Sequence, residues 1–375
     1  MWAMIVKEFR QLRRDRRTLA MMIFLPVLML IIFGYAASFD VHNIPVTVVG
    51  PRANEVAASL HSPLHATKVA PGENRADAVS ALRDGKTPTA AVADTNGTTV
   101  LLDGSQLFIA NATKAAIAAQ SARAAHTASA TQKLSARQEA PPSGTKIDVL
   151  FNPNLKTSDI MIPGLAGLIL LFVGMVITSL GVVRERQAGT LEQLAVMPMR
   201  PRDVFLGKIV PYFLVAAIDL AIVIAVGVAL FSVPFRGSIL VFGLGALLFV
   251  FVTLGMGVLI SSVSETQGQA IQLAIMAMLP QVMLSGLIFP LSSMAAGVRW
   301  LGYVLPLTYF VDITRAVMLR GASLGSVWAP FVYLALIGLI VTVLATLRFR
   351  RFLAPSPRRA RTEQVPAVAT AGAPK

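Results

Sequence analysis

The sequence predicts an α-helical polytopic membrane protein with six transmembrane helices and an extracytoplasmic α/β domain between the first and the second. Hydrophobic residues make up 55% of the 375 residues and charged residues only 14%, whereas soluble domains carry about 25% charged residues. Uncharged runs of about 20 residues, the length that crosses a bilayer as a helix, recur along the chain. Both observations exclude an ordinary soluble globular protein.

The basic residues indicate the orientation in the membrane. The formal net charge is +14, and Lys and Arg gather in residues 1–17 and 348–375, whereas residues 39–159 are almost balanced. The positive-inside rule then predicts that both termini are cytoplasmic. Because the basic residues flank apolar runs, we expect the lipid bilayer and no nucleic acid as their partner. The chain has no cysteine, which excludes disulfides and thiolate metal sites.

The first apolar run, residues 18–38, allows two interpretations. Residues 35–38 resemble a signal-peptide cleavage site, but the run exceeds the 7–15 residues of a signal h-region, which favours a retained first span. The other five predicted spans are residues 160–183, 209–231, 238–262, 270–290 and 326–347. Six spans place both termini on one side and make residues 184–208 a cytoplasmic loop.

Residues 39–159 between the first two spans predict a mixed α/β domain. Asn96-Gly97 lies between two β-rich runs and is a strong hairpin signal. The remaining expected elements are strands at 45–49 and 146–151 and helices at 76–84 and 106–137. Because the N-terminus before the first span is predicted to be cytoplasmic, we expect this domain to be extracytoplasmic, facing the periplasm in a bacterium.

Two further segments complete the chain. Residues 291–325 predict two short helices in the outer leaflet, because Pro306 can open a helix and the next turns carry Asp312 and Arg315, too polar for a full span. Residues 348–375 form a basic cytoplasmic tail whose Pro, Ala and Arg content favours disorder.

A short charged helix is predicted in the cytoplasmic loop. Thr190 followed by Gln193 is a capping-box pattern, Leu191 and Leu194 share one apolar face, and Pro198 ends the helix. Spacing alone leaves two interpretations open. The helix either connects two spans or receives force from a cytoplasmic partner.

Several motifs together resemble the type-2 ABC exporter permeases over nearly the whole chain. Residues 182–194 read VVRERQAGTLEQL and precede Met197-Pro198, and residues 284–290 and 306–310 read LSGLIFP and PLTYF. The N-terminal KEFRQLRRD is similar to the amphipathic elbow helix of that family, here residues 1–17. The large outer segment is similar to the multidrug-export subgroup.

The resemblance implies a partner for the charged helix. In that family a separate cytoplasmic ATPase subunit pushes on the helix after the second span, and two permease protomers pair as a homo- or heterodimer. The residues that would take part in this coupling are Arg184, Glu185, Gly189, Thr190, Leu191, Glu192, Leu194 and Pro198. ATP and Mg would be bound by the ATPase and no cofactor by this chain. A periplasmic adaptor and an outer-membrane channel are further expected partners, and the bacterial inner membrane is the expected location.

Residues within the spans suggest packing and transport roles. Gly167, Gly174 and Gly181 recur every seven residues, and such small residues allow close helix approach. Met276, Gln281 and Ser285 are candidates to line a translocation path, with helix–helix contact as the alternative. The intramembrane acid Asp219 is predicted to make a structural hydrogen bond, with ion coupling as the alternative.

The expected function is therefore the permease subunit of an ATP-driven exporter of hydrophobic or amphipathic compounds. The chain shows no P-loop and no catalytic side-chain arrangement, so we expect it not to be an enzyme. Two other classes stay open. An ion-coupled secondary transporter would need intramembrane acids such as Asp219, and a membrane receptor or scaffold would use the outer domain without transport.

Overall fold

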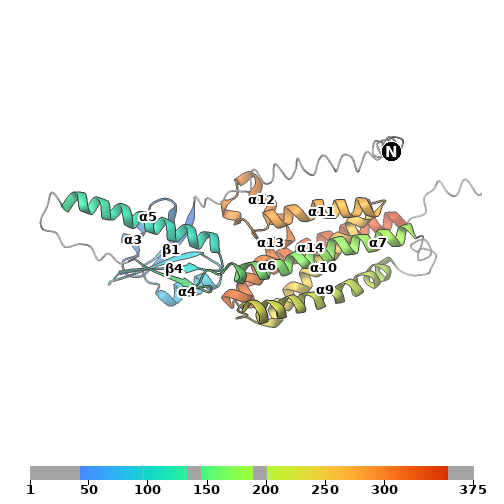
Figure 1. Ribbon diagram of the computed structural model, residues 1–375, viewed down its shortest axis with the longest axis horizontal. Helices are drawn as coiled ribbons and strands as arrows, with labels where there is room; N and C mark the ends of the chain where they lie inside the picture. Colours follow the sequence, from blue (N-terminus) through green and yellow to red (C-terminus); the bar gives the residue numbers. More distant parts are fainter. Residues whose placement is uncertain (1–42, 96, 133–144, 189–200, 354–375) are drawn as a thin grey trace, which may run out of the picture.

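The computed structural model describes residues 43–95, 97–132, 145–188 and 201–353. It shows an α/β domain at one end of an elongated molecule and a bundle of helices at the other (Figure 1). The predicted elbow helix at 1–17 and first span at 18–38 lie outside the described residues. The same is true of residues 189–200 and 354–375.

The α/β domain contains a five-stranded mixed sheet in the order β2-β1-β3-β4-β5. Its strands are β1 (Ile44–Val49), β2 (Leu64–Ala70), β3 (Thr89–Asp94), β4 (Gly97–Asp103) and β5 (Lys146–Leu150). β3 and β4 pair antiparallel with Asp94 opposite Gly97, which confirms the hairpin predicted from Asn96-Gly97. The other neighbouring strands pair in parallel.

Helices cover both faces of this sheet. α3 (Ala53–Ser59) and α5 (Leu107–Gln132) pack on the face that carries Val46, Val48 and Val100, and α4 (Arg75–Arg83) packs on the face of Val49 and Val92 (Figure 1). The side chains of one strand alternate between these two cores. α3 and β2 were not among the predicted elements, because β2 is an edge strand whose middle five residues are exposed.

Four helices within the described residues are long and apolar enough to cross a membrane. The first runs over Thr157–Gln187 and consists of α6 (Thr157–Phe172), the π-helical turn η1 (Val173–Ile177) and α7 (Thr178–Gln187). The others are Phe213–Phe231 within α9 (Pro201–Phe231), Ile239–Val263 (α10), and Leu324–Arg348 within α14 (Leu324–Leu353). The total of six spans stays a prediction.

At three places the helix ends differ from the predicted bounds of the spans and loops. α9 already begins at Pro201, since proline suits the first helical turn, so a helix covers the last residues of the predicted loop 184–208. α14 continues to Leu353, so the first residues of the predicted tail are helical. α11 (Gln267–Leu284) ends before the predicted Pro290, because Gly286 has a φ of +81° that terminates the helix.

The segment after α11 contains the short helices expected at 291–325. These are the 3₁₀ turn η2 (Leu291–Ser293), α12 (Ala296–Val304), α13 (Pro306–Arg315) and the π-helical turn η3 (Ala316–Arg320). α13 is almost fully buried, and the stacked rings of Phe310 and Phe249 join it to α10 with centroids 4.4 Å apart. The interior of the bundle is therefore built on α10 and α13.

Close approach of α10 to the first long helix depends on glycine. A Cβ atom on Gly174 would lie 2.2 Å from Thr253 Oγ1, and one on Gly257 would lie 2.4 Å from the Gly174 carbonyl oxygen. Gly167 similarly faces Leu307 and Phe310 of α13, where a Cβ would come within 2.9 Å of each. Gly181 lies half-buried in α7.

We expect Gly174→Val to destabilise the bundle. Inserted methyl groups in a packed core cost about 1–3 kcal/mol, and here Thr253 and the α10 backbone block them. The melting temperature and the yield of monodisperse protein should fall. Gly243→Val is the matched control, since no heavy atom lies within 4 Å of a Cβ at that position in α10. Equal losses in both variants would contradict the close-packing role.

Candidate functional site

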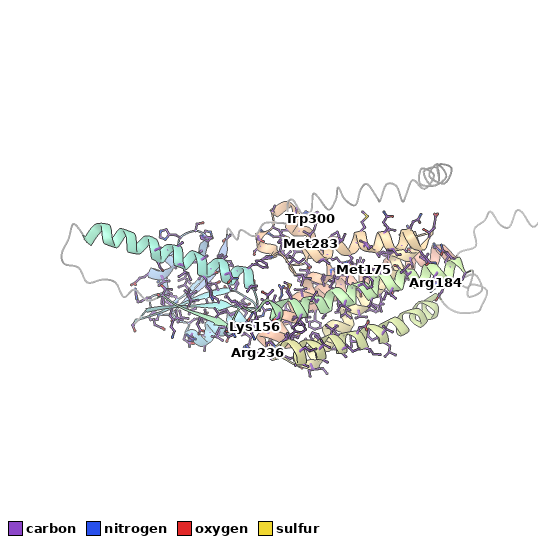
Figure 2. All side chains as sticks on the ribbon, in the orientation of Figure 1. Lys156, Met175, Arg184, Arg236, Met283 and Trp300 are labelled. Atoms are coloured by element: carbon purple, nitrogen blue, oxygen red, sulfur yellow. The ribbon has the colours of Figure 1, made fainter. Side chains whose placement is uncertain are left out.

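The end of α7 that is remote from the α/β domain is the first part of the candidate site. Figure 2 shows the long helix running from Lys156 beside the domain to Arg184 at the other end of the bundle. Arg184 is exposed and Glu185 half-buried. The other predicted coupling residues, Gly189, Thr190, Leu191, Glu192, Leu194 and Pro198, lie outside the described residues.

Two polar bridges join this end of α7 to the turn between α10 and α11. The Arg186 guanidinium donates to the carbonyl oxygen of Ser264, and Gln267 Nε2 donates to Gln187 Oε1 at 2.8 Å. Thr266 caps α11 by accepting from the Gln269 amide at 3.2 Å. The α10–α11 turn and the last turn of α7 are thus held together. The sequence does not show that Arg186 and Gln267 make these contacts, because the partner of each residue is distant in sequence.

The candidate translocation residues lie where α11 meets the π-helical turn. Gln281 is fully buried, and its Nε2 lies 3.4 Å from both Met175 Sδ and the Ala277 carbonyl oxygen. Ser285 is buried at the end of α11, and Met276 is half-buried. Both polar groups lie inside one protomer, the arrangement expected from helix–helix contact. Gln281 Oε1 is buried without a hydrogen-bond partner among the described residues.

Asp219 lies on α9 and is half-buried. Within the described part of the chain, no hydrogen bond or ion pair of its carboxylate is present. The predicted structural hydrogen bond is therefore not seen among these residues. Nor do these residues contain a group of His, Asp and Glu side chains that could hold a metal ion.

A buried ion pair connects the α/β domain to the helical bundle. Asp103 at the end of β4 is 1% exposed, and its carboxylate accepts from Ser105 N at 2.9 Å, from Ser105 Oγ at 2.6 Å and from Arg320 Nη1 at 3.4 Å. Arg320 ends the π-helical turn after α13. The Ser105 amide and hydroxyl hydrogen-bond, and the Arg320 guanidinium neutralises, a carboxylate that would be costly to bury alone.

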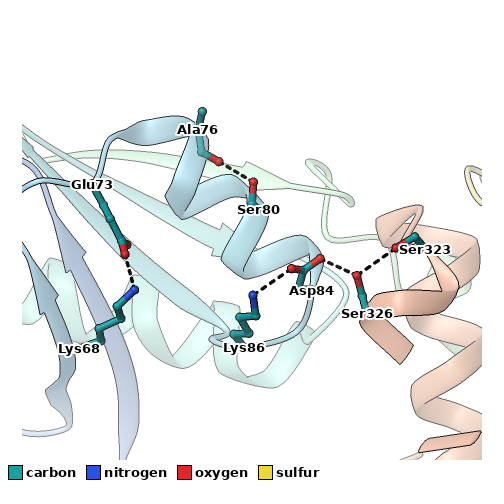
Figure 3. Close-up of polar contacts among 8 residues, drawn as sticks. All are labelled: Lys68, Glu73, Ala76, Ser80, Asp84, Lys86, Ser323 and Ser326. Atoms are coloured by element: carbon teal, nitrogen blue, oxygen red, sulfur yellow. Dashed lines mark hydrogen bonds and ion pairs between the residues drawn. The ribbon is translucent and has the colours of Figure 1, made fainter. Parts of the chain in front are cut away.

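A second contact joins the same two parts. Ser326 at the start of α14 donates to Asp84 at 2.7 Å, and Lys86 lies 3.2 Å from the same carboxylate (Figure 3). The hydroxyl of Ser326 holds the pKa of Asp84 below the usual carboxyl range; partial burial opposes this, and Lys86 adds to it. A lowered folded-state pKa means that the contact stabilises the fold above the ordinary carboxyl pKa and is lost as the pH falls through the lower value.

Arg315 fixes the loop after α11 to α13. Its two terminal nitrogens donate to the carbonyl oxygens of Gly286 and Leu287 at 3.0 and 3.1 Å. Arg315, Asp312 and Arg320 line a cavity of about 370 Å³ between the domain, α6 and this loop. In the sequence, Asp312 and Arg315 stand out only as polar residues in an apolar context, and no local pattern marks Asp103 or Arg320.

Helices long and apolar enough to cross a membrane, with an α/β domain fastened to one end of the bundle, are consistent with a polytopic membrane permease. The sequence pattern of the ABC-2 family transporter proteins matches residues 16–347. The chain belongs to this family of transport subunits.

The chain is similar to several curated permeases. It is 31% identical over 343 residues to the probable multidrug ABC transporter permease YbhR of Escherichia coli strain K12, covering 88% of this chain and 92% of that protein. It is 30% identical over 341 residues to the probable multidrug ABC transporter permease YbhS of the same strain, covering 85% and 88%. The inner membrane transport permease YhhJ is 35% identical over 205 residues, 54% of each chain.

We expect Arg320→Ala to destabilise the domain–bundle junction by on the order of 3 kcal/mol, because it leaves the buried Asp103 carboxylate without its guanidinium. Hydrogen exchange of the β4 amides in the full chain measures the loss. Arg75→Ala is the matched control, since its ion pair with Asp148 at 2.5 Å is solvent-exposed and should cost under about 1 kcal/mol. Similar protection in the two variants would refute a structural role for the buried pair.

Proposed function

We propose that this chain is the permease subunit of an ATP-driven exporter that moves hydrophobic or amphipathic compounds outward across the bacterial inner membrane. Family membership and the multidrug names of the two relatives support the transport class. The observation that carries the coupling proposal is the pair of polar bridges from Arg186 and Gln187 to the α10–α11 turn. Through them, displacement of the α7 end moves two further helices.

The coupling contact is proposed to be the segment from Arg184 and Glu185 to Pro198. A cytoplasmic ATPase would bind ATP and Mg and press on this segment. Arg184 is exposed at the helix end and is available to such a partner, whereas Arg186 is held by Ser264. A second permease protomer would complete the transporter. The apolar helices α9 and α14 are mostly exposed, and their outward side chains, which include Leu214, Ile222 and Leu339, are available to lipid or to that protomer.

Copurification with candidate ATPase subunits tests the proposal. The purified complex in lipid should hydrolyse ATP faster when hydrophobic compounds are added. Transport that follows a proton or sodium gradient without ATP would instead support the ion-coupled class, in which Asp219 would take part. Absence of both activities in a folded, ATPase-bound complex would leave the receptor or scaffold class.

Charge reversal in the predicted coupling helix should uncouple the two subunits. Glu192→Lys removes a favourable helix-dipole interaction of only about 0.3–1 kcal/mol, too little to unfold a membrane bundle, so the permease should still assemble. ATPase association or compound-stimulated hydrolysis should fall at least about tenfold, a loss of about 1.4 kcal/mol. Leu194→Asp should act in the same way by spoiling the apolar face.

Glu192→Gln is the control that separates charge pairing from helix capping. It removes the charge but keeps the side-chain size and a hydrogen-bonding group, so lost coupling in this variant would assign the effect to charge pairing, and retained coupling would argue against it. If both severe variants bind the ATPase and export normally, the segment is only a connector.

The proposed topology predicts opposite labelling of cysteines introduced at two alanine positions. The chain has no cysteine, and Ala118 of α5 and Ala188 after α7 are both exposed. Ala118→Cys should react with an impermeant maleimide in intact spheroplasts, and Ala188→Cys only after lysis. The reverse pattern would place the α/β domain in the cytoplasm.

A further inference from the structure

We propose that the α/β domain holds a binding site for a small, uncharged, largely apolar molecule, separate from any path through the membrane bundle. The site is a cavity of about 240 Å³ between the sheet and the helices α3 and α5. This inference goes beyond the proposed function, since it depends neither on the ATPase nor on the direction of transport.

The cavity exists because the centre of the sheet carries small side chains on this face. Its floor is formed by Ala91 and Thr89 of β3 together with Val46 and Val100 of the adjacent strands. A central strand buried on both faces usually carries Val, Ile or Leu, whereas β3 reads TAAVAD. Alanine is a weak strand former. Where the cavity opens, β3 therefore has a lower strand propensity and fills less of the core than a central strand usually does.

The walls have the composition of a ligand site. Leu60, Leu64 and Ile117 supply apolar surface, whereas Ser59, Gln120 and Ser121 contribute polar groups, and none of the described residues that line the cavity is charged. Gln120 Nε2 donates to the His61 carbonyl oxygen at 2.9 Å and ties α5 to the loop after α3 beside the cavity. An apolar pocket with a few polar groups is the usual design of a small-molecule site.

Thr89 supplies the second observation. The residue is fully buried, and its Oγ1 has no hydrogen-bond partner among the described residues, although buried hydroxyls normally have one. The lining hydroxyls of Thr113 and Ser59 are satisfied by the carbonyl oxygens of Ile109 and Val56 at 2.7 and 2.8 Å. Thr89 is thus a fully buried lining residue whose hydroxyl lacks a partner among the described residues, and rotation about χ1 can exchange the positions of its hydroxyl and methyl groups.

Size and charge define the ligand class. A cavity of about 150 Å³ accommodates benzene, so about 240 Å³ suits a molecule of one or two rings. Burying an ionised group without a charged partner is costly, so the ligand is neutral. The free Thr89 hydroxyl favours a ligand with one hydrogen-bonding group over a pure hydrocarbon.

The absence of cysteine from the chain allows a direct test with the full protein in nanodiscs. Thr98 and Thr99 are neighbours on β4 with similar partial exposure, but only Thr98 lines the cavity, because successive strand residues point to opposite faces. The rate at which a charged thiol reagent modifies Thr98→Cys is compared with that of Thr99→Cys, with 2-naphthol as the probe.

At a probe concentration about four times its Kd, 2-naphthol should slow modification of Thr98→Cys about fivefold by mass action and leave Thr99→Cys unchanged. Naphthalene-2-sulfonate, with the same rings and a charge, should not protect. No protection by 2-naphthol, equal protection of both cysteines, or equal protection by the sulfonate would each overturn the proposal.

Two substitutions localise the binding. Ala91→Ile fills the cavity with a better strand former and should abolish protection while the Thr99→Cys rate stays normal. Thr89→Val keeps the side-chain shape and should weaken protection by 2-naphthol severalfold without changing protection by naphthalene. Undiminished protection in Ala91→Ile would place the probe elsewhere, and an equal effect on both probes in Thr89→Val would remove the hydroxyl from the site.

Discussion

The buried carboxylate of Asp103 constrains how the two parts of this molecule fit together. A charge with 1% exposure requires donors around it, and they come from both parts. The Ser105 amide and hydroxyl belong to the α/β domain, and the Arg320 guanidinium belongs to the helical bundle. Moving the domain away from the bundle would leave this charge buried with fewer donors or expose it to water. The domain is therefore held in a defined position over α13 rather than on a loose tether.

The two irregular turns in the bundle helices also lie at contacts between separate elements. The π-helical turn η1 carries Gly174, against which α10 packs, and η3 carries Arg320 at its end. A π turn is rare and costs hydrogen-bond geometry, and it commonly occurs at functional positions. Here one such turn lies where Gly174 lets α10 approach, and the other presents the cation for Asp103. Both irregularities coincide with contacts between separate elements.

The sequence was informative where the signal is local. Asn96-Gly97 predicted the hairpin because a two-residue turn needs only its own residues, and uncharged runs predicted the long helices because bilayer thickness fixes their length. β2 was not predicted because buried and exposed residues do not alternate along it. The contact between the α/β domain and the bundle was not predicted for a different reason. Asp103 and Arg320 are 217 residues apart, and neither has a neighbour that marks it as half of a pair. Arg186 and Ser264, 78 residues apart, are missed in the same way.

Polar contacts of this kind occur at both ends of the bundle, and apolar packing fills the space between them. At the α7 end, Arg186 and Gln187 hold the α10–α11 turn; at the other end of α11, Arg315 holds the loop that follows it. Five residues after Arg315, Arg320 reaches Asp103 of the α/β domain. Hydrogen bonds are directional and fix the register of two elements, whereas apolar packing alone lets helices shift. Fixed ends and a packed middle let α11 move as a unit. A displacement applied at the α7 end would therefore reach the α/β domain through α11 and α13.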